Sequence, residues 1–199
     1  MVIPEVLEAA HLFAARALQD GDVAVDATIG NGHDTRFLAE QVGPAGQVFG
    51  FDVQEAAVRR TRTRVHEAQN EASLELFHAG HERMLDHLPA DVHGDVSAVM
   101  FNLGYLPGSD SSCITQPETT LDGLAAAVQA LRSGGVVTVV LYTGHDGGAA
   151  EANAVWDWAA AQPQDRVHVL SYQFMNQEND PPQLLVLEKR QDGEAKRKQ

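Results

Sequence analysis

Apolar positions follow two different periods along this chain, and segments of the two kinds succeed one another. Apolar residues recur every three to four positions over residues 5–19, which predicts a helix that ends at Asp20-Gly21. Further helices are predicted over residues 34–42, 55–69, 82–88, 119–131 and 149–161. Short apolar runs between them predict strands over residues 23–26, 47–53, 74–78, 96–102, 136–142, 167–174 and 184–188.

This alternation predicts an α/β fold with a mostly parallel sheet covered by helices on both faces. The last two strands have no helix between them, so Asn179-Asp180-Pro181-Pro182 should connect an antiparallel hairpin. No internal repeat or linker divides the 199 residues, which predicts one domain over residues 1–190 and a basic, disordered tail over 191–199. The apolar runs are strand-sized, the start is unlike a signal peptide and Cys113 is the single cysteine. These features predict a cytoplasmic protein with no membrane segment.

A glycine-rich turn follows the first predicted strand, in the run Asp26-Ala27-Thr28-Ile29-Gly30-Asn31-Gly32-His33-Asp34-Thr35. Gly30 and Gly32 allow a tight turn that brings backbone close to a ligand. Asp52 follows about twenty residues later, near the end of the second strand, where a carboxylate can accept both ribose hydroxyls of a nucleoside. Together the two features predict a nucleoside cofactor site.

The residues of this turn favour S-adenosylmethionine over NAD. A dinucleotide site needs a third glycine for close packing of helix on strand, and Thr35 occupies that position. Asp26 would sit poorly beside a pyrophosphate, but it suits the ammonium group of a methionine moiety, directly or through water. The alternative is that Asp26 caps the turn that follows it.

The run His78-Ala79-Gly80-His81-Glu82 follows the third strand, where a methyltransferase surrounds the adenine. His81 or Glu82 could bond the adenine amine or line its edge, or the two residues could simply begin the next helix. A zinc site of His78, His81 and His87 lacks further ligands to complete a tetrahedral set, so no metal is predicted. Cys113 has no obvious base beside it and is not predicted to be a nucleophile.

The loop after the fourth strand, Asn102-Leu103-Gly104-Tyr105, has the Asn-x-x-Tyr spacing of the Asp/Asn-Pro-Pro-Tyr loop of amino-group methyltransferases. Attack on a sulfonium methyl needs a nitrogen lone pair aimed at the carbon, with the hydrogens of that nitrogen held elsewhere. The Asn102 side-chain oxygen and the Leu103 carbonyl can accept those hydrogens, while Gly104 allows close approach. Tyr105 can stack on a base, or it can be a buried residue of a capped loop.

An alkylamine substrate must lose a proton before it attacks, so a base or a desolvated site is needed. His145 in the run Gly144-His145-Asp146-Gly147-Gly148, and Glu151 just beyond it, are the candidate bases. His145 could instead cap the next helix.

The charge of the chain argues against broad binding of nucleic acid. The net charge is −14; residues 1–188 contain nine Arg and no Lys and carry −17, whereas the last eleven residues carry +3. A protein that grips many phosphates normally has a basic face. Any contact with RNA should therefore be local and sensitive to salt.

Five motifs taken together resemble the YtqB/MnmM group of class I methyltransferases, long labelled rRNA methylases. They are Asp-Ala-Thr-x-Gly-Asn-Gly-x-Asp-Thr, Phe-Asp-x-Gln, Asn-Leu-Gly-Tyr-Leu-Pro-Gly, Gly-His-x-Gly-Gly and Asn-Asp-Pro-Pro-x-Leu, spread over residues 5–189. The resemblance implies a Rossmann-like seven-stranded sheet in the order 3-2-1-4-5-7-6, S-adenosyl-L-methionine as cofactor and a homodimer. It also implies methylation of the aminomethyl nitrogen of 5-aminomethyl-2-thiouridine at the tRNA wobble position (U34), with the anticodon stem-loop as partner.

The resemblance also places residues in two regions. The residues that match the cofactor region of the family are Gly30, Asn31, Asp34, Asp52, Gln54, His81 and Glu82. The glycine-rich turn itself predicts two more cofactor residues, Asp26 and Gly32. The residues that match the substrate side of the family are Asn102, Tyr105, Tyr142 and His145. The loop after the fourth strand predicts two more, Leu103 and Gly104. The predicted catalytic residues are Asn102, Tyr105 and His145, and Asn102 also faces the cofactor. The alternatives are a methyltransferase for an rRNA base or a small amine, a non-catalytic nucleoside-binding module and an NAD oxidoreductase.

Overall fold

Seven strands form one sheet in the computed structural model, which describes residues 2–67, 72–104, 115–144 and 147–191. The strands are β1 (Val23–Asp26), β2 (Gln47–Asp52), β3 (Ser73–His78), β4 (Val96–Asn102), β5 (Leu131–Leu141), β6 (Val167–Tyr172) and β7 (Gln183–Lys189). Their order is β3-β2-β1-β4-β5-β7-β6, and only β7 runs antiparallel to its neighbours β5 and β6. The predicted fold class and the terminal hairpin are confirmed.

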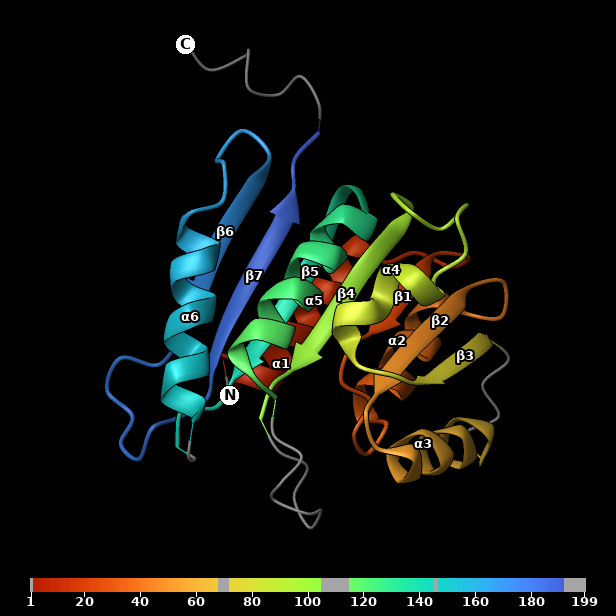
Figure 1. Cartoon of the computed structure of the whole chain (residues 1–199), viewed down its shortest axis with the longest axis horizontal. Coiled ribbons are helices and arrows are strands. Elements are labelled where there is room, and N and C mark those ends of the chain that lie inside the picture. Colours follow the sequence, from red (N-terminus) through yellow and green to blue (C-terminus); the bar gives the residue numbers. More distant parts are fainter. Residues whose placement is uncertain (1, 68–71, 105–114, 145–146, 192–199) are drawn as a thin grey trace.

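The helices cover both faces of this sheet (Figure 1). They are α1 (Val6–Ala17), α2 (His33–Val42), α3 (Glu55–Glu67), α4 (Met84–His87), α5 (Pro117–Ala130) and α6 (Gly148–Ala160), with a 3-10 turn, η1 (His81–Arg83), before α4. Alternate residues of a strand point to opposite faces, so each strand supplies two cores. Ala24 and Val48 pack with α1 and α2, whereas Val25 and Phe49 pack with α4, α5 and α6. The sheet is therefore buried on both sides along its centre.

The structure extends β5 furthest beyond its predicted bounds. β5 begins at Leu131, which pairs with Val96, and the register shifts before Val136 pairs with Ala98. Residues 131–135 read Leu-Arg-Ser-Gly-Gly and have no strand pattern, so only pairing with β4 makes this segment part of the sheet. The predicted helix over residues 82–88 is divided into η1 and the single turn α4.

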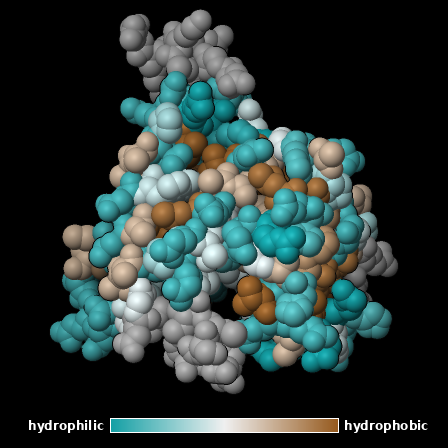
Figure 2. Space-filling view, viewed as in Figure 1, coloured by the Kyte–Doolittle hydropathy of each residue, from teal (hydrophilic) through white to brown (hydrophobic). Residues whose placement is uncertain are grey.

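Polar side chains cover most of the face shown in Figure 2, and apolar groups lie between them in small separate areas. Within the described ranges, no helix combines the length and the hydropathy that crossing a membrane would require.

Candidate active site

A cavity of about 630 Å³ opens beyond the carboxyl ends of the central strands. Its walls come from the turn after β1, the end of β2, the segment after β3 and the corner after β4. β1 has β2 as its neighbour on one side and β4 on the other, so the strand order reverses direction at β1. The cavity is at this topological switch point of the sheet. Open α/β sheets bind their ligands at this point.

Eleven of the predicted site residues line this cavity. They are Gly30, Asn31, Asp34, Asp52, Gln54, His81, Glu82, Asn102, Leu103, Gly104 and Tyr142. Asp26 and Gly32 are not among the lining residues. The predicted residues Tyr105 and His145 lie outside the described residues.

The Asp52 carboxylate ties the glycine-rich turn to the end of β2. Its Oδ2 accepts a hydrogen bond from the Gly30 N–H at 2.8 Å, and its Oδ1 accepts one from the Gln54 N–H at 2.8 Å. Both oxygens retain further lone pairs, and the side chain lines the cavity. The carboxylate is thus held in a fixed position where a ribose can reach it.

The Asp26 carboxylate is fully buried beneath the turn and does not face the cavity. It accepts hydrogen bonds from Thr35 Oγ1 at 2.5 Å and from the Thr28 N–H at 3.1 Å. Burial, followed by the nearby charge of Asp34, raises its pKa to about 7. These contacts match the alternative interpretation in which Asp26 caps the turn. Asp34, in the first turn of α2, is the neighbouring carboxylate that lines the cavity, whereas Asp26 does not.

Gly32 lies between the turn and α3, and it allows the two to approach closely. Its φ of 78° is in the left-handed region, and an added Cβ would lie 2.8 Å from Thr61 Cγ2 on α3. A side chain at this position would therefore be strained and would also push α3 away from the turn.

His81 connects the segment after β3 to the centre of the fold. The ring is buried, its Nδ1 donates to the Ala27 carbonyl at 3.2 Å, and its edge packs on Phe101. Burial lowers its pKa, so the imidazole is neutral near pH 7. His78 Nε2 bonds to the Val53 carbonyl at 2.9 Å, and no group of three His, Cys, Asp or Glu suited to a metal occurs in the part of the chain that is described.

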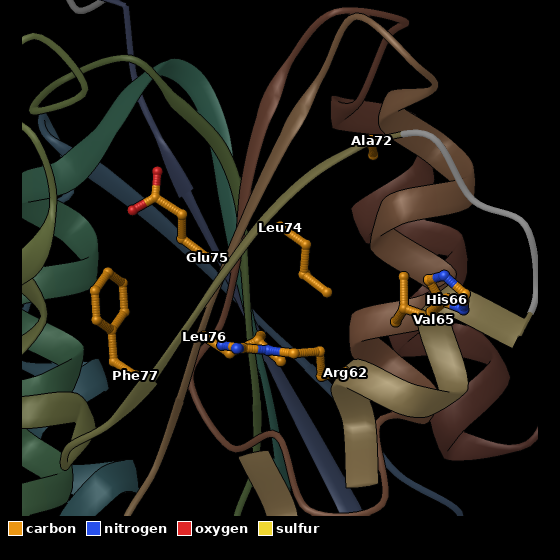
Figure 3. A pocket seen from close by; sticks show the side chains of 8 residues that line it. All are labelled: Arg62, Val65, His66, Ala72, Leu74, Glu75, Leu76 and Phe77. Carbon is orange, nitrogen blue, oxygen red and sulfur yellow. The ribbon is translucent and has the colours of Figure 1, made fainter. Parts of the chain in front are cut away.

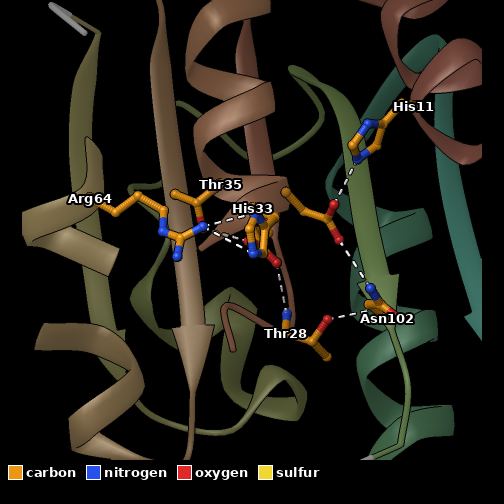
Figure 4. Close-up of polar contacts among 8 residues, drawn as sticks. His11, Thr28, His33, Thr35, Arg64 and Asn102 are labelled. Atoms are coloured by element: carbon orange, nitrogen blue, oxygen red, sulfur yellow. Dashed lines mark hydrogen bonds and ion pairs between the residues drawn. The ribbon is translucent and has the colours of Figure 1, made fainter. Parts of the chain in front are cut away.

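The corner after β4 is held by contacts with the turn and with a neighbouring loop. The Asn102 N–H donates to Thr28 Oγ1 at 2.7 Å, and the Asn102 Nδ2 donates to Asp34 Oδ2 at 3.4 Å (Figure 4). The Gly104 N–H donates to Thr115 Oγ1 at 3.2 Å, and the φ of Gly104 is 132°. The Asn102 side chain is therefore fixed at the edge of the cavity.

Glu151, proposed above as a candidate base, supports this corner. It is buried, and its carboxylate accepts hydrogen bonds from Thr115 Oγ1 at 2.7 Å and Thr120 Oγ1 at 2.6 Å. Thr115 in turn accepts the bond from Gly104. With both oxygens bonded to hydroxyls and no place among the lining residues, Glu151 is suited to holding the loop rather than to taking a proton from a substrate.

Tyr142, directly after β5, also lines the cavity. Burial, followed by the charge of Asp34, raises the pKa of its hydroxyl, so the phenol stays protonated at neutral pH. It presents a neutral group that can donate or accept a hydrogen bond.

A second hollow, of about 560 Å³, lies between α3 and β3 (Figure 3). Arg62, Leu74 and Glu75 are among the residues that line it. None of the residues that the motifs predicted lines this hollow, so it is separate from the candidate site.

Three residues that support the site were not among the predicted site residues. Thr28 and Thr115 hold the Asn102 corner, and His11 of α1 bonds to Asp34 Oδ1 at 2.7 Å. Thr28 is inside the glycine-rich run, so its position was a signal. His11 is 23 residues from its partner, and nothing in the helix period marks it.

The chemistry of the cavity fits S-adenosylmethionine. Asp34, Asp52 and Glu82 line it, and no Arg or Lys does so within the described ranges. Carboxylates suit a ribose, an ammonium and a sulfonium, whereas they would repel a pyrophosphate. The volume and the donor set therefore agree with a nucleoside carrying a cationic amino-acid tail.

Solved structures share this architecture over nearly the whole chain. A protein from Clostridium thermocellum described as a "putative rRNA-methylase" is 40% identical, with 95% of this chain and 100% of that chain covered and a TM-score of 0.90. A Streptococcus mutans protein described as "a putative methyltransferase" and solved with S-adenosylhomocysteine is 34% identical, with 94% and 99% covered and a TM-score of 0.84. Fold, cavity and this relative define a class I S-adenosylmethionine-dependent methyltransferase.

Sequence comparison identifies the family. The family described as "Putative rRNA methylase" matches residues 48–188, and the chain belongs to it. An Arabidopsis thaliana protein named "tRNA (mnm(5)s(2)U34)-methyltransferase, chloroplastic" is 34% identical in an alignment of 177 residues that covers 85% of this chain. The aligned region spans 64% of that relative's length.

Proposed function

We propose that this methyltransferase acts on the aminomethyl nitrogen of 5-aminomethyl-2-thiouridine at the wobble position of tRNA. The observation that carries the proposal is the Asn102 corner, which presents a carboxamide at the edge of a cavity lined with carboxylates. The name of the Arabidopsis relative supports the choice of tRNA. When bound, S-adenosylmethionine supplies an activated methyl group, and the protein's part is chiefly positioning.

Six of the predicted residues have a stated role in this proposal. Asn102 and the Leu103 carbonyl accept hydrogens of the substrate amine and aim its lone pair, while Gly104 gives the backbone room to approach. Tyr105 stacks on the thiouracil ring. His145 takes the proton that a protonated alkylamine must lose before it attacks. Asp52 holds the ribose of the cofactor.

RNA binding by such an acidic chain needs a local source of positive charge, and α3 provides one. Of the nine Arg in residues 1–188, four lie on this helix, namely Arg59, Arg60, Arg62 and Arg64. We call them the α3 arginine ridge. Arg60 bonds to Asn31 Oδ1, and Arg64 bonds to the His33 ring at 2.9 Å, so these two members of the ridge lie beside the cavity wall. This position suits contact with phosphates next to the target nucleotide.

The substrate is tested by methyl transfer from labelled S-adenosylmethionine. The acceptors are tRNA lacking the terminal methyl, ribosomal RNA, and the free nucleoside 5-aminomethyl-2-thiouridine. We expect label at the wobble nucleotide of tRNA. Label in ribosomal RNA alone would favour the activity in the family's description, and label on the free nucleoside alone would favour a small-molecule enzyme. Either result would overturn the tRNA assignment.

The role of the corner is tested by Asn102→Ala. We expect S-adenosylhomocysteine to bind as before while kcat falls about 100-fold or more, since misplacing a reacting group costs about this much. Asn153→Ala, on the exposed side of α6, is the matched control and should leave both quantities unchanged. An Asn102→Ala enzyme with normal turnover would show that the corner does not hold the amine.

A further inference from the structure

A series of hydrogen bonds connects α1, α2 and the corner after β4. His11 Nε2 donates to Asp34 Oδ1 at 2.7 Å, and Asp34 Oδ2 accepts from Asn102 Nδ2 at 3.4 Å (Figure 4). The His11 side chain is 33% exposed and that of Asp34 is 12% exposed. These hydrogen bonds thus connect the protein surface to the edge of the cavity.

Asp34 decides which way the Asn102 carboxamide points. An amide group has a donating NH₂ and an accepting oxygen, and an ionised carboxylate can only accept. With the NH₂ directed to Asp34, the Oδ1 of Asn102 is left for the substrate side. The Asn102 N–H is held as well, by Thr28 Oγ1 at 2.7 Å. Backbone and side chain of Asn102 are therefore both oriented by the turn after β1 and the start of α2.

His11 fixes Asp34 in turn. Its ring stacks on Phe37, with centroids 4.0 Å apart and planes at 3°, and Phe37 lies one turn after Asp34 on α2. The imidazole therefore holds one carboxylate oxygen while the other faces Asn102. The buried face of α1 consists of Val6, Ala9, Ala10, Ala14 and Ala17, so the helix is anchored to the sheet without His11.

We propose that His11 is a positioning residue for methyl transfer, which through Asp34 keeps the oxygen of the Asn102 carboxamide turned toward the substrate nitrogen. The inference rests on the proposed function in one respect only, that Asn102 accepts hydrogens of the amine. It applies equally to an amine on tRNA, on ribosomal RNA or on a small molecule.

The test compares His11→Ala, His11→Gln and Leu12→Ala on whichever acceptor the enzyme methylates. At saturating S-adenosylmethionine, we expect His11→Ala to lower kcat by about 10- to 100-fold, with KM for the acceptor unchanged. His11→Gln should recover most of the turnover, because its amide N–H can also donate to Asp34. Leu12, half exposed on the same helix, controls for changes in α1 itself.

A second measurement reports orientation without turnover. The side-chain NH₂ signals of Asn102 in a ¹H–¹⁵N spectrum, assigned by their loss in Asn102→Ala, should shift in His11→Ala and return in His11→Gln. Unchanged kcat and unchanged Asn102 signals in His11→Ala would overturn the proposal. If His11→Ala fails to fold, a folded His11→Gln with turnover reduced as far as in Asn102→Ala would overturn it as well. Normal activity in Asn102→Ala would instead contradict the proposed function.

Discussion

Replacing Asp26 with Asn should stabilise the fold above neutral pH and destabilise it slightly in acid. The Asp26 carboxylate is fully buried, and burial together with the charge of Asp34 raises its pKa from 3.8 to about 7. The unfolded chain ionises near the ordinary value, whereas the folded chain keeps the proton up to about neutral pH. Asp26 therefore costs stability increasingly as the pH rises between these two values, and the cost is complete above the higher one.

The shift sets the size of the effect. About 3 pKa units correspond to about 4 kcal/mol at 25 °C. An Asn keeps the shape but changes one acceptor into a donor, which costs about 1 kcal/mol through a weakened contact with Thr35 or Thr28. The Asp26→Asn variant should be about 1 kcal/mol less stable near pH 4 and about 2–3 kcal/mol more stable near pH 8.

Urea unfolding of both proteins at several values between about pH 4 and pH 8 measures this difference. Groups that titrate in both proteins cancel when one free energy of unfolding is subtracted from the other. Asp91→Asn, at an exposed position, is the matched control and should leave the free energy of unfolding nearly unchanged. A flat difference for Asp26→Asn as well would refute the reasoning, since it would mean that Asp26 is ionised at no cost.

Two further predictions concern the turn and the α3 arginine ridge. Gly32→Ala should lower stability by about 2–4 kcal/mol and weaken S-adenosylhomocysteine binding, because it adds contact with Thr61 to the strain of a positive φ. Gly94→Ala, with a φ of 87° and no atom within 4 Å of an added Cβ, should cost only about 1 kcal/mol and leave binding intact, and equal effects would exclude the clash. Arg62→Glu should weaken tRNA binding several-fold and reduce the slope of log affinity against log salt by about 0.7–0.9, with cofactor binding unchanged. Arg166→Glu, exposed before β6, should change neither, and equal losses in both variants would mean that net charge and not the ridge attracts RNA.

The sequence predicted those parts of the fold whose signal is local. Period-two and period-3.6 patterns located the elements, and the ends of β1, β2 and β4 located the cavity, because the carboxyl ends of parallel strands meet at one edge. The start of β5 was missed because Leu131 becomes part of the sheet only by pairing with Val96. His11 was missed for the same reason, since its partner is set by the packing of α1 on α2 and by nothing in its own helix.

Asp26 shows a different limit. An acid at the end of the first strand was expected to face the cofactor, yet its side chain turns inward to Thr35, while Asp34 faces the cavity. Strand alternation gives the face of the sheet that a residue is on, but the last residue of a strand can point along the strand axis or back under the turn. Thr35 stands where a dinucleotide site needs a glycine, and its hydroxyl is the group that donates to Asp26. The same residue therefore indicated both the cofactor class and the partner of Asp26.

The position of β7 has a consequence for synthesis on the ribosome. β7 lies between β5 and β6, so β6 emerges before the strand that it must pair with. Tyr172 at the end of β6 donates from its hydroxyl to the Pro4 carbonyl at 2.7 Å, so the segment before α1 is bound to the end of β6. The nascent chain must therefore hold β6 unpaired until residues 183–189 have left the exit tunnel, so the sheet is completed late in folding.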